Sequence, residues 1–209
     1  MQLSSLLQRF NEPETLKMAK LGRELRAKGV DVIDLSLGEP DFDTPEHIKE
    51  AAIQAVKDNF SHYTPVPGYL DLREAICTKL KRDNNLDYKP ENIIVSTGAK
   101  QSLANVILSL VDENDEVIIP TPYWVTYSEL VKIARGRVVE IKTSAKEGFK
   151  ITAEQLEKAI TPHTNVFLFS SPCNPSGAFY SHEELEELVN VFRKYPNIMI
   201  ISDEIYEYI

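Results

Sequence analysis

The sequence predicts an α/β fold with three layers, α/β/α, in which helices cover both faces of a mostly parallel sheet. Short apolar runs of strand length alternate with helical patterns along most of the chain. These runs are continuously apolar, which is typical of parallel strands that are buried on both faces. Chemically distinctive residues follow several of the runs, at the sheet edge where open α/β folds bind ligands.

The N-terminal part of the chain has a less regular pattern. Apolar residues recur every three or four positions in residues 13–28, which predicts a helix that ends at Gly29. Residues 30–37 alternate weakly and predict a strand. A second helix is predicted to begin near Pro45, because proline is accepted in the first turn, and a third spans residues 69–81.

Strands and helices then alternate regularly. The predicted strands cover residues 93–96, 116–120, 137–141, 166–170 and 198–203. The predicted helices cover residues 100–111, 124–134, 152–160 and 182–194. Two of these helices begin with the capping-box pattern, in which a hydroxyl residue and a Gln or Glu satisfy each other's backbone N–H groups: Thr152 with Gln155, and Ser181 with Glu184.

The composition limits the class of protein. The 209 residues are 43% hydrophobic and 26% charged, which is ordinary for a globular chain that forms one large core or one domain and part of another. The net charge of -9 argues against nucleic acid as the main partner. Cys77 and Cys173 suggest neither a disulfide framework nor a metal site. With no membrane-length apolar run and no signal pattern, we expect a cytoplasmic protein.

An acidic residue closes the last predicted strand. Asp203 follows the apolar run 197–202, which we expect to be buried. A buried carboxylate needs a cationic partner, and the protonated ring nitrogen of a cofactor would serve. Tyr206 follows three residues later and can point the same way within one helical turn. The alternative role for Asp203 is to cap a following helix.

Three other strand ends carry candidate binding groups. The small residues 96–101 open a helix whose free N–H groups would hold a phosphate, although an ordinary turn is the alternative. Trp124 would stack on an aromatic cofactor, or else cover the core. Asn174, between two prolines, would project its amide into the cleft from a rigid turn, which a cis Asn174–Pro175 bond would tighten; a purely structural turn is the alternative. All four features converge on one sheet edge.

Six segments in order along the chain resemble the class I aminotransferases of pyridoxal-phosphate fold type I, most closely the bacterial aspartate aminotransferase branch. They are residues 37–45 (LGEPDFDTP), 62–68 (HYTPVPG), 98–100 (GAK), 122–124 (PYW), 174–177 (NPSG) and 202–206 (SDEIY). The resemblance implies that residues 1–45 form an N-terminal arm and part of the small domain. Residues 46–209 would form the first part of an incomplete large, cofactor-binding domain.

The resemblance also implies roles at a pyridoxal 5'-phosphate site. Asp203 would pair with the protonated ring nitrogen, which prepares the ring to accept electrons from the substrate. Tyr206 and Asn174 would hydrogen-bond the phenolic oxygen of the ring, and Trp124 would stack on its face. Three consecutive residues would lie at the cofactor phosphate: Gly98, Ala99 and Lys100.

Substrate contacts are implied for Gly38, Asn174, Trp124, Thr15 and Lys100. Gly38 would present its backbone near the substrate α-carboxylate, while Thr15 and Lys100 are candidates for the distal carboxylate of aspartate or glutamate. Where the family has a serine two residues before Thr15, this chain has Pro13. Tyr63 would reach the cofactor phosphate of a neighbouring subunit, which implies a homodimer. The implied reaction moves an amino group between an amino acid, such as aspartate, and a 2-oxo acid.

The family continues past the Asp-Glu-Ile-Tyr motif to a lysine that forms the Schiff base and to an arginine that binds the α-carboxylate. No lysine of this chain stands in a matching motif after Tyr206. The chain therefore resembles the N-terminal half of an aminotransferase, and we expect it to be inactive alone. A lyase of the same fold and a non-catalytic cofactor-binding fragment are the alternatives. The segment His182–Glu184 fits a helix cap better than a metal site.

Overall fold

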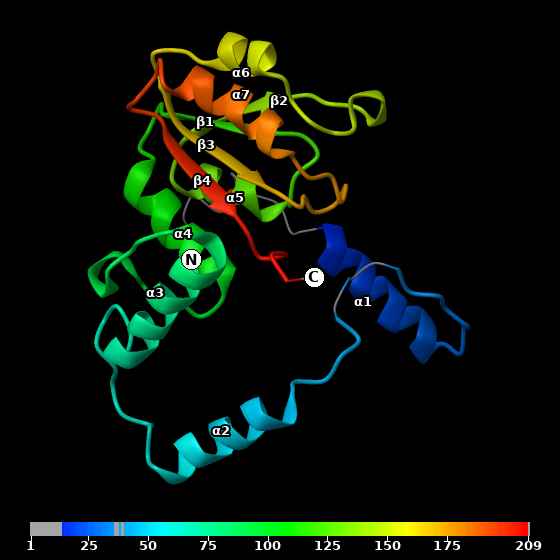
Figure 1. Ribbon diagram of the computed structural model, residues 1–209. Helices are drawn as coiled ribbons and strands as arrows, with labels where there is room; N and C mark the ends of the chain where they lie inside the picture. The colour runs from blue at the N-terminus through cyan, green and yellow to red at the C-terminus, as the bar shows by residue number, and fades with distance from the viewer. Residues whose placement is uncertain (1–13, 36–37, 39, 209) are drawn as a thin grey trace, which may run out of the picture. The chain divides into compact units, whose positions relative to one another are not determined.

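The computed structural model describes residues 14–35, 38 and 40–208. It divides into two compact units, one of residues 14–96 and one that contains the described residues from Thr97 onward. The order of elements along the chain is shown in Figure 1. The predicted domain boundary after residue 45 stays a prediction. No helix in the described part of the chain is long and apolar enough to cross a membrane.

The second unit is built on a four-stranded, all-parallel sheet, which confirms the predicted fold class. Its strands have the order β2-β1-β3-β4. The strands are β1 (Glu116–Pro120), β2 (Arg137–Ile141), β3 (Thr164–Ser170) and β4 (Met199–Asp203). The helices are α4 (Ala99–Leu110), α5 (Thr126–Ile133), α6 (Ala153–Ala159) and α7 (His182–Phe192). A short 3-10 turn, Ala145–Glu147, follows β2.

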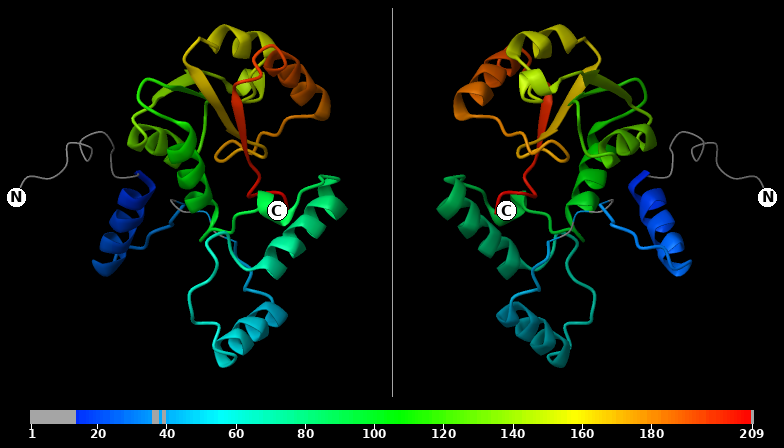
Figure 2. Two further views of the ribbon diagram at one scale, coloured as in Figure 1. Left: turned by 90° about the vertical axis from the view of Figure 1, so that its left-hand side faces the viewer. Right: turned by 90° about the vertical axis from the view of Figure 1, so that its right-hand side faces the viewer.

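Helices cover the two faces of the sheet in pairs, α4 with α5 and α6 with α7 (Figures 1 and 2). Because successive strand residues point to opposite faces, Val117 and Ile119 pack in the cluster with α4 and α5. Ile118, between them, packs in the cluster with α6 and α7. All three are fully buried, and β1 is therefore the centre of both hydrophobic clusters.

Both predicted capping boxes are confirmed. The Thr152 hydroxyl accepts from the backbone N–H of Gln155 at the start of α6, and the Ser181 hydroxyl accepts from Glu184 at the start of α7. In each case the third-position side chain accepts from the backbone N–H of the capping residue. These bonds fix where the two helices on one face of the sheet begin.

The expectation that the last strand is buried is wrong. β4 pairs only with β3 among the described residues and lies at the sheet edge. Met199 is 49% exposed and Ile200 is 45% exposed. An apolar run predicts a strand well, but its place in the sheet depends on which strands flank it.

The described residues of the first unit form three helices, α1 (Glu14–Ala27), α2 (Glu46–Lys57) and α3 (Leu70–Asn84), and a 3-10 turn, Pro90–Asn92. Pro45 caps α2 and the helix begins one residue later.

Two predicted strands are wrong. Residues 30–35 and 93–96 form no strand, while residues 36 and 37 lie outside the described part. Val95 donates one backbone bond to Pro67 (3.0 Å) but forms no ladder. Extended backbone becomes a strand only when a neighbour pairs with it.

Candidate functional site

Asp203 is the last residue of β4 and is half-buried. Its Oδ2 accepts a hydrogen bond of 2.7 Å from the hydroxyl of Tyr127, and its Oδ1 accepts one of 3.3 Å from the backbone N–H of Ile205. These two contacts are to neutral donors, a phenol and a backbone amide. The contact with Ile205 partly fulfils the alternative capping role, although the residues that follow form a turn rather than a helix.

Tyr127 is a site residue that the sequence did not reveal. It lies in α5 and is 1% exposed. Its ring meets Trp124 edge-on, with centroids 5.8 Å apart and an angle of 87°. Burial strongly raises the pKa of the Tyr127 phenol, and the hydrogen bond to Asp203 raises it further, so the hydroxyl stays protonated and donates. Its position three residues after Trp124 within the predicted helix 124–134 was the available signal, although α5 itself begins at Thr126.

The side chains of Trp124 and Lys100 lie close together. The Lys100 ammonium is 5.0 Å from the centroid of the indole ring, a distance at which a cation is attracted to the face of the ring. Trp124 is partly buried against the hydrophobic cluster that the sheet forms with α4 and α5. The indole therefore covers part of the core, which was the alternative role, while its stacking on a cofactor stays a prediction.

The start of α4 faces the same hollow as Asp203. Gly98 has a φ of +82° and precedes the first residue of the helix, Ala99. A positive φ favours glycine, and the first N–H groups of a helix have no partner within it. Ala99 and Asp203 both line a hollow of about 360 Å³ that also contains Ser102 and Ile201. A phosphate at the helix end and a group bound to the carboxylate would occupy neighbouring parts of this hollow.

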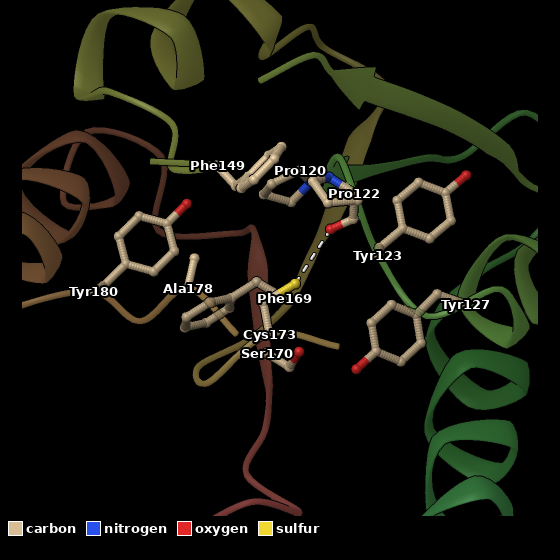
Figure 3. Close-up of a pocket in the computed structure, with 10 residues that line it drawn as sticks. All are labelled: Pro120, Pro122, Tyr123, Tyr127, Phe149, Phe169, Ser170, Cys173, Ala178 and Tyr180. Atoms are coloured by element: carbon tan, nitrogen blue, oxygen red, sulfur yellow. Dashed lines mark hydrogen bonds between the residues drawn. The ribbon is translucent and has the colours of Figure 1, made fainter. Parts of the chain in front are cut away.

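Asn174 lies in the loop after β3 and Tyr206 in the turn after β4, and the fold brings the two side chains together. The Asn174 amide donates to the Tyr206 hydroxyl (3.0 Å), and both residues line a second hollow of about 280 Å³. The predicted cis Asn174–Pro175 bond is confirmed. The Cys173 thiol donates to the carbonyl of Pro122 (3.2 Å), which ties this loop to the loop after β1 (Figure 3).

Three predicted site residues belong to the other unit. Thr15 lies in α1, while Gly38 and Tyr63 lie in exposed loops. Their roles at the substrate and in a partner subunit stay predictions. The segment His182–Glu184 forms the start of α7, where Ser181 and Glu184 make the capping box.

The described groups fit a flat, anionic, nitrogen-containing ring. A carboxylate that accepts two hydrogen bonds keeps lone pairs for a ring N–H⁺. The amide and phenol of Asn174 and Tyr206 suit a ring oxygen, and the indole of Trp124 suits the ring face. The phosphate would take the start of α4. Pyridoxal 5'-phosphate has all of these features.

A model of the family "aminotransferase class I and II" matches residues 30–209. The chain belongs to this family. It is 50% identical over its whole length to an aspartate/prephenate aminotransferase of Nitrosomonas europaea, of which it covers 53%. A probable aspartate/prephenate aminotransferase of Rickettsia felis is 47% identical over 99% of this chain and 51% of that protein.

Solved structures agree with this membership. The aspartate aminotransferase of Rhizobium meliloti superposes with a TM-score of 0.95 at 43% identity, over 99% of this chain and 52% of that one. The Thermus thermophilus aspartate aminotransferase with maleate has the same TM-score and identity, over 99% of this chain and 54% of that one. These matches confirm the resemblance and the fold. The chain spans about half the length of the relatives it matches.

Proposed function

We propose that this chain is the N-terminal part of a pyridoxal-phosphate-dependent aminotransferase that moves an amino group between an amino acid, such as aspartate, and a 2-oxo acid. The observation that supports it best is the contact of Tyr127 with both Asp203 and Trp124. It places an oriented carboxylate and a flat indole within one small group of side chains. The names of the relatives favour this reaction over a lyase reaction.

In this proposal each residue has a defined task. Bound pyridoxal phosphate supplies a ring that accepts the electron pair released at the α-carbon of the substrate. The Asp203 carboxylate holds a proton on the ring nitrogen, and Trp124 covers the ring face. Asn174 and Tyr206 orient the ring oxygen. The start of α4, residues 98–100, holds the phosphate through its backbone N–H groups.

We propose a dicarboxylic substrate for the complete enzyme. The Lys100 ammonium stands at the indole face, where a second carboxylate of the substrate would meet a positive charge. Thr15 would bind the same carboxylate, and Gly38 would bind the α-carboxylate through its backbone. One of the solved relatives is named as a complex with maleate, a dicarboxylate. A cytoplasmic homodimer, in which Tyr63 reaches the phosphate of the partner subunit, completes the proposal.

A binding titration tests the cofactor. The 209-residue chain, titrated with pyridoxal 5'-phosphate, is expected to show a saturable change in cofactor absorbance and in the fluorescence of Trp124, its single tryptophan. Pyridoxal without the phosphate should bind more weakly, because it lacks the group that the start of α4 holds. A linear, unsaturated response to pyridoxal phosphate would remove the proposed cofactor.

A turnover assay tests the expectation that the chain is inactive alone. With aspartate, 2-oxoglutarate and added pyridoxal phosphate, we expect no product above background, because no lysine here matches the family residue that moves the substrate proton. The Nitrosomonas europaea relative in the same assay provides the positive control. Steady product formation by the 209-residue chain, proportional to its concentration, would contradict the expectation.

A further inference from the structure

We propose that Tyr127 is a positioning residue that aims the Asp203 carboxylate at the cofactor ring and joins it mechanically to Trp124. The inference rests on the proposed function, since it concerns the same ring. It adds a residue that lies outside the six motifs of the resemblance. Tyr127 would not touch the reacting atoms and would act through Asp203.

Two hydrogen bonds orient the carboxylate of Asp203. The Tyr127 hydroxyl holds Oδ2 at 2.7 Å, and the backbone N–H of Ile205 holds Oδ1 at 3.3 Å. With one donor on each oxygen, the carboxylate cannot rotate freely about its Cβ–Cγ bond. Each oxygen still has a lone pair for a ring N–H⁺, so the two bonds orient the group without occupying it fully.

Asp203 and Tyr127 differ in how deeply they are buried. Asp203 stands at the end of the edge strand β4, which pairs with β3 alone in the described structure and is largely exposed. Tyr127 is 1% exposed and belongs to the hydrophobic cluster that the sheet forms with α4 and α5. The bond therefore ties the half-buried last residue of an edge strand to the buried interior, across 76 positions of sequence. A side chain at a sheet edge needs such an anchor to keep a fixed direction.

Tyr127 also contacts the indole ring of Trp124. The Tyr127 ring meets Trp124 edge-on at 5.8 Å, and its backbone N–H donates to the Trp124 carbonyl at 3.0 Å. Figure 3 shows the Tyr127 hydroxyl directed toward Ser170 and the strand β4. One side chain thus sets the place of the carboxylate through its hydroxyl and the place of the indole through its ring. Phenylalanine at this position separates the two effects, because it keeps the ring and loses the hydroxyl.

Two ligands in a binding titration isolate the role of the hydroxyl. One is pyridoxal 5'-phosphate, and the other is its analogue with C–H in place of the ring nitrogen. Tyr127→Phe is expected to weaken binding of pyridoxal phosphate by about tenfold, or about 1.4 kcal/mol. Binding of the carbon analogue should stay unchanged, because it has no ring N–H⁺ for Asp203 to meet.

Tyr123→Phe is the matched control. Tyr123 stacks on Tyr127 with centroids 6.4 Å apart, and its hydroxyl donates instead to Glu140 (2.7 Å). This variant also removes one phenol next to the site, yet it should bind both ligands like the parent chain. Equal weakening of both ligands by Tyr127→Phe would show a packing role and overturn the inference. No weakening of either would overturn it as well.

A measurement without cofactor separates this inference from the proposed function. The ¹³C carboxyl signal of Asp203, identified by its loss in Asp203→Asn, should shift in Tyr127→Phe and stay in place in Tyr123→Phe. An unmoved signal in Tyr127→Phe overturns the inference, whatever the cofactor does. A parent chain that binds neither ligand overturns the proposed cofactor and with it the role of Tyr127 toward the ring, a result that is recognisable from the parent chain alone.

Discussion

Asp203→Asn is expected to weaken the binding of pyridoxal 5'-phosphate by about 100-fold, or about 3 kcal/mol, because it removes the charge that pairs with the protonated ring nitrogen. Asparagine has nearly the same shape and can still accept from Tyr127 through its amide oxygen. The loss would therefore report the missing charge and not a collapsed site. Titration by cofactor absorbance measures it directly.

Glu204→Gln provides the control for that experiment. Glu204 follows Asp203 directly, is exposed, and accepts from the Ser202 hydroxyl at 3.0 Å. Its substitution removes an equal charge one residue away and should change the affinity by less than about threefold, since exposed charges are screened by solvent. An Asp203→Asn variant that binds as tightly as Glu204→Gln would contradict the ion pair on which the proposed cofactor depends.

Phe167→Ala is expected to lower the free energy of unfolding by about 3–5 kcal/mol, because it leaves a cavity in the centre of the cluster between the sheet and α6 and α7. Phe167 is 1% exposed, and its ring lies 5.3 Å from that of Phe169 and 5.1 Å from that of Phe192. Few neighbours can move into the space, since the residue belongs to a central strand. Urea denaturation followed by circular dichroism gives the change.

Phe179→Ala is the matched control for the core variant. Phe179 is 66% exposed and lies outside both buried clusters. Its replacement should change the free energy of unfolding by less than about 0.5 kcal/mol. If the two variants unfolded at the same urea concentration, Phe167 would not be part of the buried cluster between the sheet and helices α6 and α7.

Local sequence patterns were sufficient to predict many of the helices and strands of the second unit. The strands β1 and β2 begin and end as predicted, because each contains three β-branched apolar residues within five positions, between segments of helical pattern. The start of α7 at His182 was equally readable, since Ser181 and Glu184 form their hydrogen bonds within one helical turn. The residues of the Asn174 turn were predicted from their two prolines.

The pairing of strands and the contacts between residues far apart in sequence could not be predicted from local patterns. Residues 93–96 have a strand-like composition but form no ladder, and β4 has a core-like composition but lies at an edge. Composition records the preference of one segment, while strand formation and burial depend on a second segment. The bond from Tyr127 to Asp203 joins positions 76 residues apart, so no local period could indicate it.

The sequence by itself determined the order of helices and strands in the second unit, the sheet edge that carries Asp203, Asn174 and Trp124, and the family. These follow from periodicity, turn chemistry and short motifs, all of which act over a few residues. Only the tertiary structure decided that β4 lies at the edge and that a buried tyrosine holds its terminal carboxylate. Both depend on which parts of the chain meet after folding, and that choice is made by the packing of the whole core.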